Sequence, residues 1–169
     1  NACLQAALNP PMPGKQERKS GEFTFREGDR VMQIRNNYDI LWKQSDGTIG
    51  TGIFNGDVGT ITAIDPAMET LTVVYDDREA DYDFTQLGEL EPAYAMTVHK
   101  SQGSEYPFVI IPMYGAPLPL LTRNLLYTAV TRARRMVILV GREDIVRTMV
   151  GNNRQSMRYT GLVYRLKAD

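Results

Sequence analysis

The chain of 169 residues has little of what several classes of protein require. Cys3 is the only cysteine, which excludes a disulfide framework and a cysteine-built zinc site. His99 is the only histidine, which leaves few ligands for other transition metals. Residues 107–122 are uncharged, but they hold four prolines and fall short of the roughly 18 apolar residues of a membrane span. The opening residues lack the basic start of a signal peptide, so we expect a cytoplasmic protein that contacts no membrane.

Basic residues are scarce in the first part of the chain and acidic residues in the last part, which the formal net charge of -1 conceals. Residues 1–122 hold 9 basic and 17 acidic side chains, whereas residues 123–169 hold 10 basic and 3 acidic ones. A basic region of this kind suits an anionic partner on one face of the protein. A basic face that is merely solvated fits the same counts.

A phosphate-binding P-loop is also absent. The required pattern is GxxxxGK[ST], but Gly14-Lys15 is followed by Gln16 and has Asn9 at the position of the first glycine. Residues 71–77, LTVVYDD, combine an apolar run with two acids as magnesium-binding strands do. Their setting among short β runs instead predicts a strand and a turn, so we expect this chain alone to hold neither ATP nor Mg²⁺.

Residues 1–92 divide into two segments of different texture. Residues 1–28 contain a proline-rich stretch and a polar run, which predict a connector without hydrophobic core. Residues 29–92 alternate short β runs with turn residues and predict a small antiparallel barrel. Asn55-Gly56 predicts a tight turn within it, because both residues tolerate positive φ.

Residues 93–169 alternate strands and helices, which predicts an α/β architecture. The apolar runs FVIIP (108–112) and MVILVG (136–141) suit parallel strands buried on both faces. The helix between them is predicted from apolar residues at helical spacing: Leu121, Leu125, Leu126, Ala129, Val130 and Ala133. A second helix is expected over residues 143–150 and a short terminal helix within residues 158–169.

The segment AMTVHKSQGSE, residues 95–105, lies just before one of these strands, where α/β folds place ligands. It combines hydroxyl and amide side chains with His99, the cation Lys100 and, at Gly103, a place where backbone can approach a ligand closely. His99 alone is equally well explained as a core histidine bonded to a carbonyl group. The concentration of polar groups favours a ligand-binding loop.

A second candidate is LLYTAVTRARR, residues 125–135, in which three arginines lie within four positions. On a helix with about 100° per residue, Arg132 falls on the margin of the apolar stripe, whereas Arg134 and Arg135 point elsewhere. An arginine at a domain edge can neutralise a transferring γ-phosphate, because its planar guanidinium matches the phosphate oxygens. A surface arginine on a helix is the alternative explanation.

These two segments resemble motifs V and VI of superfamily 1 helicases. GDRVMQIRNNYD (28–39) and FNGDVGTI (54–61) are similar to RecD-like members of superfamily 1B, and NACLQAALNPP (1–11) is similar to the stretch after motif IV. The resemblance implies a partial RecA-like parallel-sheet domain, 2A, with an inserted SH3-like β-barrel, 2B. Residues 1–28 and 93–169 would belong to domain 2A, and residues 29–92 to domain 2B.

The resemblance also implies roles for individual residues. Thr97, His99 and Lys100 match positions that contact single-stranded DNA. Gly103 and Glu105 match positions beside the nucleotide, where the glutamate commonly meets the ribose. The barrel would help to hold the single strand.

Arg132 matches the motif VI arginine finger, which reaches across a domain cleft to the γ-phosphate of ATP. The implied protein is a longer ATP-dependent 5′–3′ DNA helicase, of which this chain is a C-terminal fragment. An upstream RecA-like domain of the same protein would supply the P-loop and complete the ATP and Mg²⁺ site. A nuclease complex is a further partner that the resemblance suggests.

Two alternatives stay open at the level of sequence. The chain could belong to the helicase half of a conjugative relaxase, or it could be a non-catalytic SH3-like module that binds nucleic acid or protein. The barrel also offers aromatic residues that could stack on bases: Tyr38, Trp42, Phe54 and Tyr82. Of these, we expect Trp42 and Phe54, beside a glycine-rich stretch, to be exposed.

Overall fold

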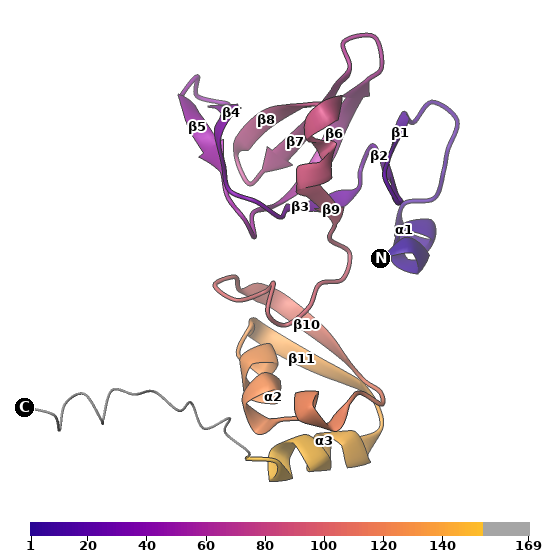
Figure 1. Ribbon diagram of the computed structural model, residues 1–169, viewed down its shortest axis with the longest axis vertical. Helices are drawn as coiled ribbons and strands as arrows, with labels where there is room; N and C mark the ends of the chain where they lie inside the picture. Colours follow the sequence, from indigo (N-terminus) through magenta and orange to yellow (C-terminus); the bar gives the residue numbers. More distant parts are fainter. Residues whose placement is uncertain (154–169) are drawn as a thin grey trace, which may run out of the picture. The chain divides into compact units, whose positions relative to one another are not determined.

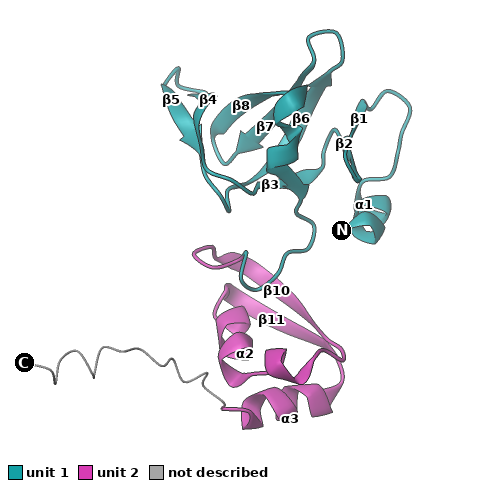
Figure 2. Ribbon diagram, viewed as in Figure 1, with its two compact units in different colours: residues 1–100 teal, residues 101–169 magenta. Residues whose placement is uncertain are grey.

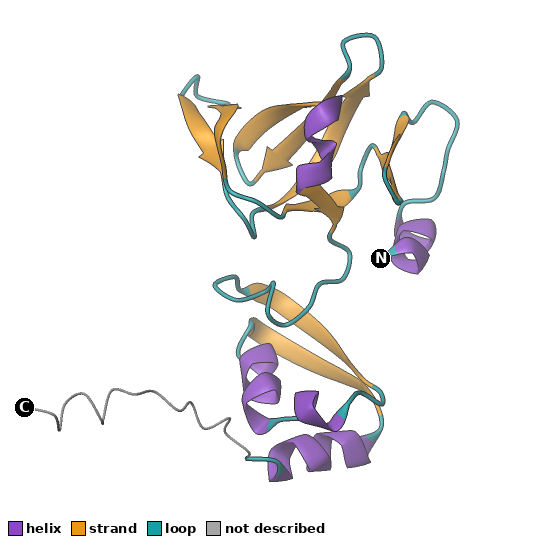
Figure 3. Ribbon diagram, viewed as in Figure 1, coloured by secondary structure: helices purple, strands orange, loops and turns teal. Residues whose placement is uncertain are grey.

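The computed structural model describes residues 1–153 of the chain. They fall into two compact units, divided in the sequence between Lys100 and Ser101 (Figure 2). The first unit is built mainly of strands, and the second combines strands with helices (Figure 3). The terminal helix expected within residues 158–169 lies outside the described residues.

The first unit opens with a helix and a hairpin. Helix α1 spans Ala2–Leu8, and strand β1 (Glu17–Ser20) pairs with strand β2 (Phe23–Arg26) in an antiparallel hairpin (Figure 1). Phe25 of β2 is fully buried and belongs to the hydrophobic core of the unit. The expectation that residues 1–28 contribute no core is therefore wrong, because the strand is too short for its alternation to stand out from the polar residues around it.

Seven antiparallel strands form the main sheet of the first unit, in the order β5-β4-β8-β7-β6-β3-β9. The strands are β3 (Arg30–Gln33), β4 (Asn37–Gln44), β5 (Ile49–Ile53), β6 (Val58–Asp65), β7 (Thr70–Tyr75), β8 (Arg78–Asp83) and β9 (Leu90–Pro92). A 3₁₀ helix, η1 (Phe84–Glu89), leads into β9. The predicted antiparallel β domain is confirmed. Within residues 1–153 its hydrogen-bond ladder ends at β5 and β9, so the strands do not close into a continuous barrel.

The core of the first unit follows the two-residue period of its strands. In β7, Leu71, Val73 and Tyr75 are buried while the residues between them are half-buried. Trp42 of β4 packs against this core from its edge, and the guanidinium carbon of Arg78 lies 5.8 Å from the centroid of its ring. Gly50, the cross-strand partner of Trp42 on β5, leaves the space that the indole occupies.

The second unit contains the predicted β-α-β arrangement. Strands β10 (Tyr106–Met113) and β11 (Ala133–Gly141) pair in parallel, with Ile110 opposite Ile138. The short 3₁₀ helix η2 (Leu118–Leu120) and helix α2 (Arg123–Val130) lie between them in sequence, and α3 (Glu143–Gly151) follows β11. Thr122 caps α2 by accepting a hydrogen bond from the backbone N–H of Leu125 at 3.3 Å.

Helix α2 is shorter than the sequence predicted. It ends at Val130, and β11 begins at Ala133, so residues 134 and 135 lie on a strand and not on the helix. Pairing with β10 sets this boundary, because Tyr106 is the parallel partner of Ala133 and its N–H donates to the carbonyl of Arg132 at 2.8 Å. Ala133 fits the apolar spacing of the helix by coincidence, because it is an apolar residue of the strand that follows.

The helices cover one face of the two-stranded sheet. Four buried residues, Met113, Leu121, Ile145 and Met149, form the core between the strands and helices. On the strands, Phe108 and Ile110 remain 57% and 65% exposed. Burial on both faces, which the unbroken apolar runs predicted, is therefore not found among the described residues.

Candidate functional site

The segment 95–105 leaves the main sheet and forms an irregular turn before β10. It follows β9 and contains no helix or strand. Gly103 has a φ of 86°, a left-handed conformation that a residue with a Cβ rarely adopts. The division between the two units falls inside this segment, so residues 97–100 belong to the first unit and residues 103–105 to the second.

The predicted DNA-contacting residues share the turn at the end of the first unit. The backbone N–H of Lys100 donates to the Thr97 hydroxyl at 3.2 Å, and the Lys100 ammonium lies 2.5 Å from a carboxylate oxygen of Glu91. Thr97, His99 and Lys100 are all exposed. Thr97, Lys100 and Glu91 also line a cavity of about 120 Å³. The turn thus presents a hydroxyl, an imidazole and an ammonium group to solvent, which suits contact with a phosphate backbone.

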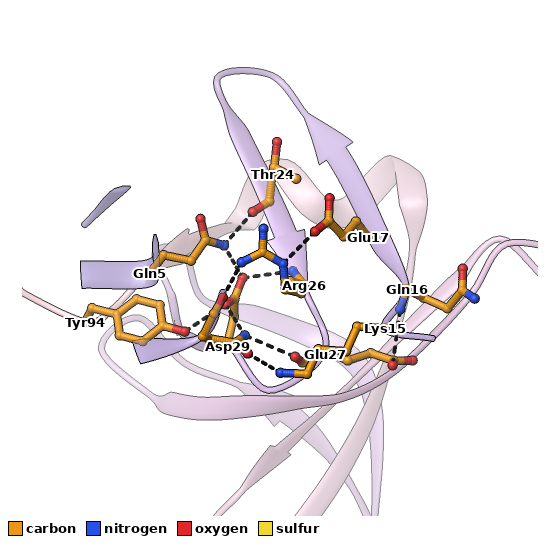
Figure 4. A network of polar contacts seen from close by, with 10 residues as sticks. Gln5, Lys15, Gln16, Glu17, Thr24, Arg26, Glu27, Asp29 and Tyr94 are labelled. Atoms are coloured by element: carbon orange, nitrogen blue, oxygen red, sulfur yellow. Dashed lines mark hydrogen bonds and ion pairs between the residues drawn. The ribbon is translucent and has the colours of Figure 1, made fainter. Parts of the chain in front are cut away.

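A buried polar network lies behind the start of this turn. Asp29 is fully buried, and its carboxylate accepts hydrogen bonds from the Gln5 and Asn9 amides at 2.5 and 2.7 Å and from the Tyr94 hydroxyl at 2.8 Å (Figure 4). Burial, followed by the hydrogen bond to Asp29, raises the pKa of the Tyr94 hydroxyl to about 12. The network joins α1 and the start of β3 to the residue that precedes the turn.

In the second unit, Arg132 lies in the tight connection between α2 and β11. Its Nε donates to the carbonyl of Thr128 at 3.2 Å, and its Nη1 donates to the carbonyl of Ser104 at 3.2 Å. The side chain is half-buried. Because a guanidinium has five N–H donors, these two bonds leave others able to reach a phosphate group. The structure therefore brings Arg132, the predicted arginine finger, against the backbone of Ser104.

Glu105 is placed beside the same connection by an arginine that sequence reasoning assigned no role. Arg134 Nε donates to a Glu105 carboxylate oxygen at 2.6 Å, and both side chains are exposed. The sequence does hold a signal for placing Arg134 near Arg132, since residues 132 and 134 lie on one face of an extended chain. It was missed because the arginines were assigned to a helix.

The four aromatic residues that could stack on bases differ in their exposure to solvent. Tyr38 and Phe54 are 66% and 41% exposed, and their rings meet edge to face at 5.6 Å. Trp42 is half-buried at the edge of the core, and Tyr82 is fully buried. Exposure is confirmed for Phe54. For Trp42 it is wrong, because the glycine on the neighbouring strand lets the indole lie against the sheet.

The described residues contain no cluster of three or more histidine, cysteine or carboxylate side chains that could hold a metal ion. Among the helices of residues 1–153, none is long and apolar enough to span a membrane.

Two family models match successive parts of the chain. Residues 1–75 match the SH3 domain of ATP-dependent RecD-like DNA helicases, and residues 92–140 match the C-terminal domain of UvrD-like helicases. The second match contains both the turn at 97–100 and the connection that carries Arg132.

The chain is also similar in sequence to curated RecD proteins. The ATP-dependent RecD2 DNA helicase of Deinococcus radiodurans is 34% identical over 168 residues, which cover 99% of this chain and 21% of the relative. The RecBCD enzyme subunit RecD of Mycobacterium tuberculosis is 40% identical over 119 residues, or 70% of this chain and 20% of that subunit. The chain therefore spans about a fifth of the length of these relatives.

Solved structures show the same fold in Pif1 helicases. A Pif1 helicase studied for DNA unwinding at forked double-stranded DNA superposes with a TM-score of 0.53 at 20% identity, over 89% of this chain and 37% of that one. Bacteroides Pif1 bound to single-stranded DNA gives a TM-score of 0.51 at 16% identity, over 99% and 43% of the two chains.

Taken with the antiparallel sheet and the β-α-β unit, these matches define the class: the chain is a C-terminal region of a helicase. Within that class it belongs to the RecD-like family.

Proposed function

We propose that the chain forms the C-terminal part of a longer ATP-dependent 5′–3′ DNA helicase. In this proposal it supplies single-stranded DNA contacts through Thr97, His99 and Lys100, and residues 29–92 act as domain 2B inserted into domain 2A. An upstream RecA-like domain contributes the P-loop. Relatives named as RecD subunits of RecBCD support membership of a nuclease complex, and the lack of a P-loop pattern supports an inactive fragment.

The observation that carries the ATP half of the proposal is the position of Arg132. Its guanidinium bonds the Ser104 carbonyl, so one connection holds the arginine beside Gly103 and Glu105, the residues predicted to adjoin the nucleotide. Held at its base by the Thr128 and Ser104 carbonyls, the guanidinium would donate its remaining N–H groups to phosphate oxygens. Mg²⁺ would lie with the phosphates at the P-loop domain and neutralise part of their charge.

The DNA half rests on the exposed turn of the first unit. Lys100 would contribute a charge to the phosphate backbone, and the Thr97 and His99 side chains would donate hydrogen bonds. A cytoplasmic location fits this function and stays a prediction.

DNA-stimulated ATP hydrolysis by the full-length protein tests the ATP half. Arg132→Ala should lower turnover by on the order of 10³ to 10⁵ and leave binding of single-stranded DNA nearly unchanged. Arg135→Ala is the matched control, because this arginine is exposed on β11 and three residues away. Normal turnover by Arg132→Ala would refute the arginine finger.

Binding of a fluorescent single strand at several salt concentrations tests the DNA half. Lys100→Ala should weaken binding and reduce the slope of log K against log salt by about 0.7, the contribution of one phosphate contact on a single strand. Thr97→Ala should weaken binding without that change in slope. A module that binds only protein would show no affinity for the strand in any variant.

A further inference from the structure

Three consecutive residues before the 97–100 turn are held by three different partners. The N–H of Ala93 donates to the carbonyl of Arg30 at 2.8 Å, and the hydroxyl of Tyr94 donates to the Asp29 carboxylate at 2.8 Å. The N–H of Ala95 donates to the side-chain carbonyl of Asn1 at 2.7 Å. These bonds fix the path of the chain immediately before it turns outward.

Asp29 is the centre of this arrangement. In addition to Tyr94, the Gln5 and Asn9 side chains and the backbone N–H of Arg26 donate to its two oxygens, the last at 2.8 Å (Figure 4). Hydrogen bonds to an ionised group are about twice as strong as neutral ones, and a buried carboxylate persists only with such partners. Asp29 thus links α1, the β1–β2 hairpin and the start of β3 at one point.

Tyr94 is not needed to complete the hydrophobic core. The core cluster of the first unit lies within the strands and η1, and Tyr94 is only half-buried outside it. Its hydroxyl instead reaches back across 65 positions of sequence to Asp29. This contact fixes the chain three residues before Thr97, at the entry to the turn.

The far end of the turn is held as well. Lys100 returns to β9 through its ion pair with Glu91, and its N–H closes the turn on Thr97. An exposed pair of this kind contributes little stability, because solvent screens it. With the entry to the turn fixed and the turn closed by the bond from the Lys100 N–H to Thr97, the turn would lose less freedom when a ligand binds it, which favours tighter binding.

We propose that Asp29 and Tyr94 are positioning residues that hold the 97–100 turn in the conformation that binds single-stranded DNA. The inference rests on the proposed function of that turn, and it gives the N-terminal residues, through Asn1, Gln5 and Asn9, an indirect part in DNA binding.

Tyr94→Phe in the full-length protein is the first test, because it removes one hydroxyl and keeps the ring. Amide hydrogen exchange of residues 95–100 should become faster, and the dissociation constant for single-stranded DNA should rise about three- to tenfold. Asp29→Asn, which keeps the shape but not the charge, should act in the same direction. Tyr114→Phe, which removes an exposed hydroxyl at a residue without a predicted ligand contact, should change neither quantity.

A double-mutant cycle separates positioning from general damage. If Tyr94 acts through the turn, Tyr94→Phe should weaken DNA binding much less in a Lys100→Ala background than in the wild type. Fully additive losses, or unchanged exchange and affinity in Tyr94→Phe, would overturn the inference while leaving the proposed function intact. If Lys100→Ala and Thr97→Ala bind DNA normally, the DNA half of the proposed function fails and this inference fails with it.

Discussion

The hydrogen bonds that the Tyr82 hydroxyl makes inside the main sheet can be tested by mutation. This hydroxyl lies 2.7 Å from the Tyr75 hydroxyl and donates to the side-chain carbonyl of Gln33 at 3.0 Å, and all three residues are fully or almost fully buried. Because Tyr82 uses its proton toward Gln33, Tyr75 must be the donor between the two tyrosines. The Gln33 amide continues the chain to Glu89 at 2.9 Å.

The direction of these bonds makes the two tyrosines unequal. Tyr82→Phe removes both bonds and leaves the Tyr75 donor and the Gln33 carbonyl unpaired in the interior, which should cost about 2 to 3 kcal/mol of unfolding free energy. Tyr75→Phe removes one bond and leaves the bond from Tyr82 to Gln33 in place, so about 1 kcal/mol is expected.

Urea unfolding followed by circular dichroism measures both values. Tyr38→Phe supplies the baseline, because an exposed hydroxyl should change stability by less than about 0.5 kcal/mol. Equal losses in the two core variants, or a larger loss for Tyr75→Phe, would refute the donor order described above.

Three further results are expected. Burial raises the pKa of the Tyr75 and Tyr82 hydroxyls above the usual value. Since these hydroxyls ionise at lower pH in the unfolded chain, the free energy of unfolding should fall as pH rises above about 10. The tyrosinate absorbance of these two residues should then appear only as circular dichroism shows unfolding. Gly59→Ala would bring a Cβ within 2.7 Å of the Val74 carbonyl oxygen and should cost about 1 to 3 kcal/mol in urea unfolding, whereas Gly88→Ala meets no atom within 4 Å and should cost little. Gly141→Ala, at a φ of 136° and against the Met113 backbone, should lower the midpoint of thermal unfolding of the second unit, and an unchanged midpoint would contradict that geometry.

Much of the fold follows from local pattern, and the exceptions have specific causes. The alternation of Leu71, Val73 and Tyr75 is visible in sequence because a strand with one buried face requires it. The end of α2 is not visible, because it depends on the pairing of Ala133 with Tyr106, which is 27 positions away. Burial of Phe25 likewise depends on strands far along the chain.

The site shows the same limit. The concentration of polar groups in residues 95–105 predicts a ligand-binding loop, whereas the roles of Thr97, Lys100 and Arg132 follow from the family resemblance and stay predictions. The partners that hold them, Glu91 and the Ser104 carbonyl, could not be chosen from sequence, because each is one of many similar groups and only folding brings it near. Asp29 resembles an ordinary turn aspartate until its buried donors are known.

The placement of Trp42 has a practical consequence for optical spectroscopy. It is the only tryptophan in the chain, and it lies at the edge of the core on β4, beneath Arg78. Indole emission therefore reports on the sheet of residues 1–100 and carries no direct signal from the second unit. Selective excitation of this one fluorophore would follow unfolding of the first unit alone, while far-ultraviolet circular dichroism follows both, so the two spectra together would reveal whether the units melt as one.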